Sequence, residues 1–177
     1  MMRQKTKQSL MNKQATTIGK PPKLLIGWQE WCALPKLLVP AIKAKIDSGA
    51  KTSALHAFDI RPFHRHGELY VHFIVHPLQR SKKIPTSCTA LVVDQRTVMN
   101  SGGHKELRYV INTMVTLGQM TWDIEITLTN RDPMTFRMLL GRNALKGHLI
   151  IDPGKTLSQG KLSLKQLRSL YAKHHSG

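Results

Sequence analysis

The stretch Ala41-Ile42-Lys43-Ala44-Lys45-Ile46-Asp47-Ser48-Gly49-Ala50 decides the fold. Its first six residues alternate between apolar side chains and lysines, which is typical of a strand with one buried face. An Asp-Ser-Gly turn follows directly, and glycine adopts tight-turn dihedral angles without steric cost. The sequence therefore predicts a strand that presents the carboxylate of Asp47 at its end. Alone, such an aspartate indicates no more than a stabilised turn, so chemistry requires further motifs.

Two further motifs follow along the chain. Met138-Leu139-Leu140-Gly141-Arg142-Asn143 reads as an apolar strand that ends in glycine, with a short helix predicted over Arg142 to Lys146. Asn100-Ser101-Gly102-Gly103-His104 is flanked by strand-like sequence and reads as a hairpin tip. Paired glycines make such a tip easy to move, and a mobile hairpin over a carboxylate suits a lid that excludes water.

Short alternating or apolar segments separated by turn signals occupy most of the remaining chain. We predict strands near residues 24–28, 51–56, 68–76, 90–93, 108–117, 120–128, 136–140 and 148–151. The prolines at Pro35 and Pro40 predict a loop between the first strand and the strand that ends at Asp47. Leucines at helical spacing predict a helix over Leu162 to Tyr171. Many short strands with regular turns indicate an all-β barrel or sandwich.

The charge is unevenly distributed along the chain. The net charge is +17, and residues 1–23 and 155–177 carry Lys and Arg but no acidic residue. We expect a disordered basic tail over residues 1–22, a folded domain over residues 23–155, and a basic C-terminal tail with helical character over residues 156–177. A basic chain attracts acidic peptide or nucleic acid.

Other global features favour a cytoplasmic protein. The chain has no run of eighteen apolar residues, so we expect no membrane association. Its first twenty residues lack the apolar segment of a secretory signal. Cys32 and Cys88 form no CxxC pair, and we expect two free thiols in a reducing compartment.

The carboxylate turn, the glycine-tipped hairpin and the Leu-Leu-Gly-Arg-Asn segment occur in an order that resembles the retropepsins, the single-lobe aspartic peptidases of retroviral type. Residues 27–30, 34–35, 44–57 and 131–142 also resemble a bacterial family labelled ATP-dependent zinc protease, which is regarded as retropepsin-like. The resemblance extends from about Gly27 to Pro153. It implies an all-β fold, a closed six-stranded retropepsin (acid protease) barrel with one short helix after the Leu-Leu-Gly-Arg-Asn motif.

The resemblance also implies roles for the motif residues. In retropepsins two chains pair, and each supplies one aspartate to a dyad that shares a proton and activates one water. Carried over, Asp47 is the catalytic residue of each subunit, and Ser48, Gly49 and Ala50 form the active-site loop. The flap is Asn100, Ser101, Gly102, Gly103 and His104, with the hairpin from Phe63 to His76 as an alternative. Structural support for the loop comes from Gly141, Arg142 and Asn143.

A complete dyad requires a homodimer. None of the other aspartates is followed by Ser-Gly or Thr-Gly: Asp59, Asp94, Asp123, Asp132 and Asp152. The chain thus has no second carboxylate turn of this type. Either two copies meet at a two-fold axis, or the chain is not a peptidase of this type.

The zinc and ATP labels have no matching motif in the sequence. There is no His-Glu-x-x-His and no Gly-x-x-x-x-Gly-Lys-Ser/Thr, so we expect neither a metal nor another cofactor. His64, His66, His72 and His76 lie close in sequence, but solvent-facing strand histidines explain them better than a zinc site. Cys88 with a histidine as a cysteine-peptidase pair lacks any supporting pattern.

Two functions follow from these observations. The first is a homodimeric aspartic peptidase. Members of the family often accompany ligases that add glutamate to a ribosomal protein tail, which implies acidic or glutamylated tails as substrates, and the positive charge suits them. The second is a catalytically inactive retropepsin-like module that binds acidic peptide or RNA through its cleft and basic tails. The sequence shows no series of stacking aromatics or RNA-recognition motif. We therefore rank the binding module after the peptidase.

Overall fold

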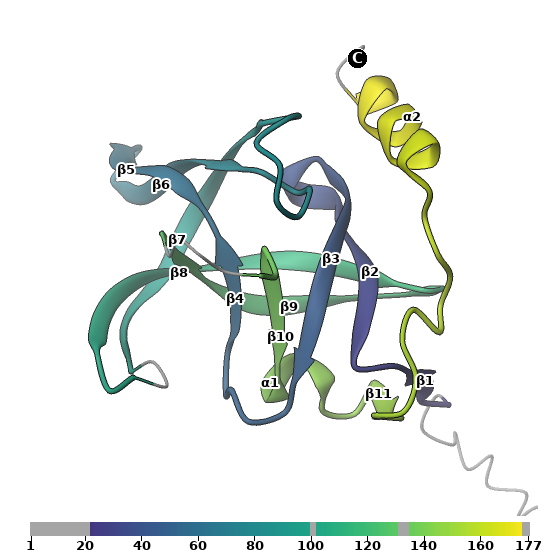
Figure 1. Ribbon diagram of the computed structural model, residues 1–177. Helices are drawn as coiled ribbons and strands as arrows, with labels where there is room; N and C mark the ends of the chain where they lie inside the picture. Colours follow the sequence, from purple (N-terminus) through teal and green to yellow (C-terminus); the bar gives the residue numbers. More distant parts are fainter. Residues whose placement is uncertain (1–21, 100–101, 131–134, 175–177) are drawn as a thin grey trace, which may run out of the picture.

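Six strands close into a barrel in this computed structural model, which describes residues 22–99, 102–130 and 135–174 (Figure 1). Around the barrel the order is β2–β3–β10–β4–β9–β8, and β8 pairs with β2 to close it. This confirms the predicted all-β retropepsin-type barrel. The barrel strands are β2 (Gln29–Leu34), β3 (Val39–Asp47), β4 (Ser53–His56), β8 (Lys105–Leu117), β9 (Met120–Thr129) and β10 (Met138–Gly141).

The remaining elements flank the barrel. The sheet continues from β8 through β7 (Thr86–Met99) and β6 (Glu68–Val75) to β5 (Phe58–Arg65). A separate parallel pair joins β1 (Leu24–Ile26) to β11 (Leu149–Ile151). A single 3-10 turn, η1 (Pro35–Leu37), separates β2 from β3, and the α-helices are α1 (Arg142–Leu145) and α2 (Leu164–His174). The short helix predicted after the Leu-Leu-Gly-Arg-Asn motif is α1.

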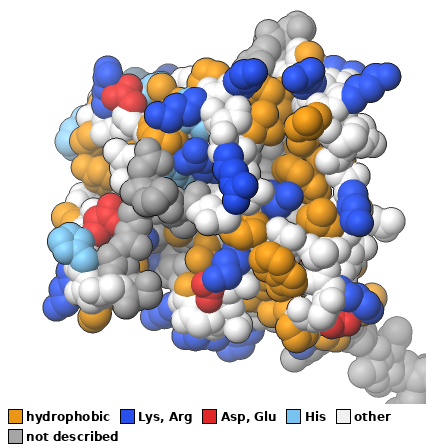
Figure 2. Space-filling model, viewed as in Figure 1, with side chains coloured by type: hydrophobic (Ala, Val, Ile, Leu, Met, Phe, Trp, Pro, Cys, Tyr) orange, Lys and Arg blue, Asp and Glu red, His pale blue; other side chains and the backbone are white. Residues whose placement is uncertain are grey.

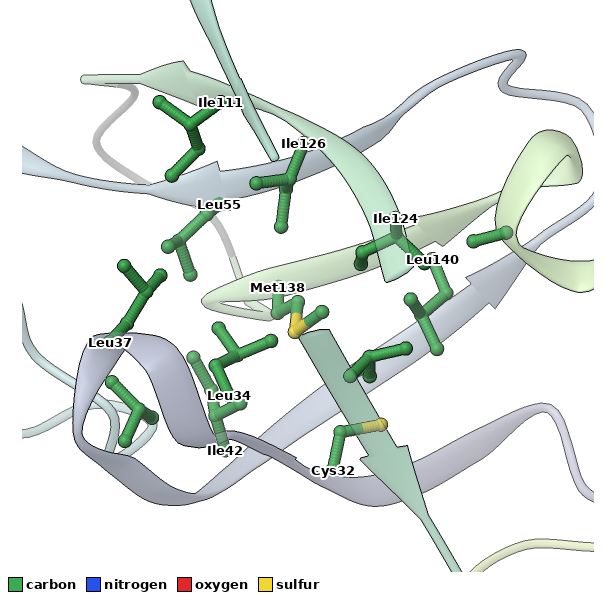
Figure 3. Close-up of a cluster of buried hydrophobic side chains, with 14 of the residues drawn as sticks. Cys32, Leu34, Leu37, Ile42, Leu55, Ile111, Ile124, Ile126, Met138 and Leu140 are labelled. Atoms are coloured by element: carbon green, nitrogen blue, oxygen red, sulfur yellow. The ribbon is translucent and has the colours of Figure 1, made fainter. Parts of the chain in front are cut away.

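Aliphatic side chains from every wall fill the barrel. Along β9, Trp122, Ile124, Ile126 and Leu128 are all buried, as the alternation in sequence predicts. Figure 3 shows how side chains from the different strands meet inside: Ile42 from β3, Leu55 from β4, Ile111 from β8, Ile126 from β9 and Met138 from β10. Complete burial of each large aliphatic side chain contributes about 1.5–3 kcal/mol.

Strand β10 lies between β3 and β4 (Figure 1). It runs parallel to β3, with Met138 opposite Ala44 and Gly141 opposite Asp47. It runs antiparallel to β4, with Met138 opposite Leu55. The segment that connects β3 to β4 must therefore pass around the end of β10, and this segment is the Asp-Ser-Gly turn.

The region around β2 differs from the prediction. Residues 29–34 form strand β2, and Pro40 lies within β3 rather than in a loop. Proline is tolerated there because the β2–β3 ladder is irregular between Cys32 and Leu34, so no regular ladder bond needs its missing N–H. Strand β7 is also far longer than the predicted residues 90–93, since its pairing with β6 and β8 extends it at both ends.

Helix α2 packs against the outer face of β3. The Tyr171 hydroxyl donates to the Ala41 carbonyl at 2.5 Å, and Leu167 and Tyr171 are buried beside Ala41. The helix lies where leucine spacing predicted one. Residues 1–21 of the predicted N-terminal tail lie outside the described residues, and the boundaries of the domain and its tails stay predictions. Neither described α-helix has the length and hydropathy that a membrane span requires.

Glu30 binds the segment around Ser158 and Gln159, which follows the barrel, and holds it against β1 and β2. Its side chain is fully buried, and its carboxylate accepts the N–H groups of Gly27 at 2.7 Å, Ser158 at 2.8 Å and Gln159 at 3.1 Å. The N–H of Trp28 also donates to the Lys155 carbonyl at 2.9 Å. A buried charge is tolerated only when its lone pairs are satisfied, and here main-chain donors far apart in sequence satisfy them.

We predict that Glu30→Gln lowers the free energy of unfolding by about 3 kcal/mol, because an amide presents a donor to buried N–H groups that need an acceptor. Chemical denaturation followed by circular dichroism measures this loss. The matched control is Glu68→Gln, at the exposed tip of the β5–β6 hairpin. Equal unfolding midpoints for the two variants would show that Glu30 does not stabilise the fold in this way.

Candidate active site

Asp47 is the last residue of β3, and its carboxylate is held by the turn that follows. Oδ1 accepts the N–H groups of Gly49 at 3.1 Å and Ala50 at 3.2 Å. Oδ2 lies 3.7 Å from Nζ of Lys45, whose half-exposed side chain makes this a weak ion pair. The two main-chain donors fix the orientation of the carboxylate, and the side chain keeps 28% of its surface exposed. One oxygen is thus held by the main chain, while the other makes only the weak contact with Lys45.

The first turn of α1 braces this loop through three hydrogen bonds. The N–H of Arg142 donates to the Ala50 carbonyl at 2.7 Å, and the N–H of Asn143 donates to the Lys51 carbonyl at 3.1 Å. The Arg142 guanidinium donates from Nη1 to the Ser48 carbonyl at 2.8 Å. The helix N-terminus uses its free N–H groups for these contacts, so helix and loop hold each other in place.

Gly141 lies where no side chain fits. It pairs with Asp47 across the β3–β10 ladder, and its N–H donates to Oγ of Ser53 at 3.1 Å. A Cβ atom at this position would lie 2.5 Å from the carbonyl carbon of Thr52. Its φ of −85° is ordinary, so the requirement for glycine is steric rather than conformational.

A groove of about 1120 Å³ opens beside the loop. The Asp47 loop and Asn143 form one side, and strands β7, β8 and β9 form the other. Its residues are Asp47, Gly49, Ala50, Lys51, Thr52, Ala54, Arg96, Thr97, Val98, Met99, Arg108, Glu125, Thr127, Thr129, Leu139 and Asn143. The site is therefore a cleft with a carboxylate at its wall, large enough for an extended peptide rather than a single small ion.

Most charges in the groove neutralise one another. Arg96 donates to Asp94 at 2.5 Å and to Glu125 at 2.6 Å. The guanidinium of Arg96 holds the pKa of Asp94 below its usual value. The nearly buried Arg108 donates to Glu106 at 2.7 Å. Since Glu125 is engaged with Arg96, Asp47 is the groove carboxylate best placed to act on a bound water.

The β7–β8 hairpin reaches the groove with the end of β7. Thr97, Val98 and Met99 line it, and Met99 is 62% exposed. Of the predicted flap, Asn100 and Ser101 lie outside the described residues, while Gly102, Gly103 and His104 follow the groove-lining residues without lining the groove themselves. No described residue of the alternative hairpin from Phe63 to His76 lines the groove, so the geometry favours the β7–β8 hairpin as the cover.

The other nucleophile and metal candidates lie elsewhere. Cys32 and Cys88 are both free, as predicted, and the structure shows that both are buried. Burial raises the pKa of the Cys88 thiol to about 12, so this thiol stays protonated at neutral pH and is a poor nucleophile. Within residues 22–99, 102–130 and 135–174, no three His, Cys, Asp or Glu side chains come together as a metal site.

Sequence reasoning identified the Asp47 loop and its support but missed most of the groove. Glu125, Thr127 and Thr129 occupy every second position on β9 and line the groove, opposite the core residues. The alternation of β9 was evident in the sequence and could have marked them as a polar face. Arg96 and Arg108 carried no comparable signal, because only the pairing of β7 with β8 brings them together, directly opposite each other.

Comparison with known proteins agrees with this geometry. A family model described as "Retropepsin-like aspartic endopeptidase RimB" matches residues 25–162. A "Probable alpha-L-glutamate ligase" of Shewanella pealeana is 49% identical over 84% of this chain and 32% of its own length. A protein of the same name from Desulfotalea psychrophila is 48% identical over 87% of this chain and 33% of its own length. The chain thus spans about a third of the length of these relatives.

A solved structure also resembles the fold. It is a Legionella pneumophila protein of unknown function (DUF785), 26% identical, with a TM-score of 0.63. The similarity covers 78% of this chain and 99% of that one. The fold therefore recurs in a crystallised protein, over nearly the whole length of that protein.

We predict that Gly141→Ala lowers the free energy of unfolding by about 2–3 kcal/mol, because the new methyl group overlaps the Thr52 main chain. Gly147→Ala is the matched control. Gly147 has a φ of +87° but no atom within 4 Å of an added Cβ, so it measures the dihedral cost alone, about 1 kcal/mol. Thermal unfolding of both variants gives the comparison, and a smaller loss at Gly141 than at Gly147 would contradict the steric account.

Proposed function

This chain belongs to the family of RimB-like, retropepsin-like aspartic endopeptidases, and from that premise we propose that it hydrolyses peptide bonds as a homodimer. The observation that carries the proposal is the Asp47 carboxylate, which is held by two main-chain N–H groups at the wall of a large groove. A carboxylate fixed on a rigid support is half of an acid–base pair. A second copy of the chain would supply the other half.

The chemistry follows from bringing two Asp47 side chains together. Two carboxylates about 3 Å apart cannot both ionise, so the pair holds one proton. The ionised member takes a proton from a water molecule as the water oxygen bonds to the peptide carbonyl carbon. The protonated member gives its proton to the carbonyl oxygen. The resulting tetrahedral intermediate breaks its C–N bond as a proton passes to the amine, which leaves one acid and one amine product.

The geometry of the Asp47 loop suits these roles of the two carboxylates. Because Gly49 and Ala50 occupy Oδ1 of Asp47, and Oδ2 makes only the weak contact with Lys45, Oδ2 remains for the water and the partner carboxylate. Arg142 acts on the Ser48 carbonyl of the loop and not on Asp47, so it is a positioning residue. An oriented carboxylate loses little entropy at the transition state, which is one of the larger sources of catalysis.

An exposed apolar surface near the loop suggests where two copies meet. Leu25 and Ile150 pair in register on the β1–β11 sheet and are 44% and 52% exposed. Trp28 is 40% exposed, and its carbonyl accepts the N–H of Ile46, the residue before Asp47. Apolar surface beside a site that needs a second subunit is suited to a two-fold interface. We infer that Leu25, Trp28 and Ile150 form part of it.

Acidic or glutamylated protein tails are the substrate class that we propose. The net charge of +17 attracts such chains over long range. The curated relatives are named for a reaction that joins glutamate, and a part of their length is similar to this chain. A ligase that joins glutamate and a peptidase that cleaves the glutamate-containing product would act on the same protein tails.

We predict that Asp47→Asn reduces hydrolysis of glutamate-rich peptides by at least about a thousandfold, because an amide cannot serve as the general base. The asparagine oxygen still accepts the N–H groups of Gly49 and Ala50, so the fold should persist, and circular dichroism checks this. Asp123→Asn, at an exposed ion pair with Lys36, is the matched control. Hydrolysis by the Asp47 variant at the rate of this control would remove Asp47 from the mechanism.

We predict that Ile150→Asp weakens self-association about tenfold or more, because it places a charge within the proposed apolar interface. Sedimentation equilibrium measures association, and peptidase activity should fall at low protein concentration and recover at high concentration. Leu164→Asp is the matched control, since Leu164 is 68% exposed and belongs to α2, which lies at the other end of the molecule from β1 and β11 (Figure 1). If both variants sediment as the parent protein does, the interface lies elsewhere.

A further inference from the structure

Lys51 is a charged, groove-lining residue beside the Asp47 loop that the chemistry above does not use. It lies four residues after Asp47, and its side chain is exposed at the groove. Its main chain is fixed, because its carbonyl accepts the N–H of Asn143 at 3.1 Å and the preceding carbonyl, of Ala50, accepts the N–H of Arg142. The main chain of Lys51 is therefore held in place relative to the Asp47 carboxylate, while its flexible side chain lines the groove.

Lys51 differs from the other cations of the groove in its charge balance. Arg96 is neutralised by Asp94 and Glu125, and Arg108 is paired with Glu106. In residues 22–99, 102–130 and 135–174, Lys51 takes part in no ion pair. An ammonium group without an internal partner can bind a ligand carboxylate without first breaking a salt bridge.

We infer that Lys51 recognises an acidic side chain of the substrate close to the bond that is cleaved. The inference rests on the proposed peptidase function and identifies the residue that determines the substrate preference. A dyad that holds one proton carries one negative charge, which repels a nearby substrate carboxylate. Lys51 offsets this repulsion at short range. In a two-fold dimer one Lys51 lies on each side of the dyad, so acidic residues are favoured at one position on each side of the scissile bond.

This short-range recognition is separable from the general positive field of the protein. Figure 2 shows Lys and Arg side chains gathered over α2 and the top of the molecule. Lys83 is exposed in the loop before β7, and its neighbour Ile84 packs with Ala41 at the start of β3. From Ala41 to Asp47 the strand runs about 20 Å at 3.3 Å per residue. A cation at Lys83 can attract an acidic chain but cannot contact a side chain beside the cleaved bond.

The test uses a glutamate-rich peptide and a set of derivatives in which one Glu at a time is replaced by Gln or by Lys. The variants are Lys51→Glu, Lys51→Met and Lys51→Arg, with Lys83→Glu as the matched control of equal charge change. At one position on each side of the bond, Lys51→Glu should shift the kcat/KM ratio of Glu to Lys peptides about tenfold or more toward Lys. Lys51→Met should abolish the preference there, and Lys51→Arg should keep it. Lys83→Glu should lower kcat/KM for acidic peptides evenly, with the ratio unchanged.

A binding measurement separates this inference from the proposed function. The same peptides, labelled with a fluorophore, are titrated with Asp47→Asn protein and with the Asp47→Asn, Lys51→Glu double variant, and anisotropy reports affinity. If the parent protein hydrolyses no peptide but Lys51→Glu still reverses the binding preference, the peptidase proposal fails and the recognition by Lys51 stands. A preference unaffected by Lys51→Glu, or altered equally by Lys83→Glu, would overturn the role of Lys51.

Discussion

The insertion of β10 between β3 and β4 is the constraint on which the rest of the site depends. A strand that pairs parallel with β3 and antiparallel with β4 must end where the segment joining them crosses over. At that point α1 begins, and its first two N–H groups donate to the carbonyls of Ala50 and Lys51. The carboxylate of Asp47 is thus positioned by the barrel itself. Catalytic groups held by paired strands are placed more accurately than groups on free loops.

The same strands separate the core from the groove. Alternate side chains of β9 point to opposite faces, so Ile124 and Ile126 pack in the barrel while Glu125 and Thr127 line the cleft. Changes to the groove face can therefore alter recognition without removing core packing. Two charged side chains that the fold buries have partners: Glu30 has three main-chain donors, and Arg108 has Glu106. Breaking either arrangement leaves buried polar groups without partners, which is far costlier than losing an exposed ion pair.

The groove of one chain presents one oriented carboxylate, one lysine that pairs with no acidic side chain of the described residues, and the end of strand β7 at its rim. In the proposed dimer each of these is duplicated about the two-fold axis, which turns half of an acid–base pair into a whole one. The duplication also links catalysis to specificity, because Asp47 and Lys51 belong to the same braced loop. A displacement of Gly141 or Arg142 would move both residues together.

Local signals in the sequence determined the turn at Asp47, the alternation of β9, the short helix after Gly141 and the leucine face of α2. Each depends on residues within about ten positions, where period and turn chemistry act directly. Strand β2 and the true length of β7 escaped prediction, because pairing with adjacent strands stabilises them where the local sequence pattern is weak.

Only the tertiary structure decided which distant residues meet. Glu30 finds Ser158 and Gln159 across 128 and 129 positions, and the β2–β8 pairing closes the barrel. Lys51 shares a groove with Arg96 and Arg108 only because β7 and β8 fold over the loop. Such contacts depend on strand register across the whole sheet, which no short stretch of sequence encodes by itself.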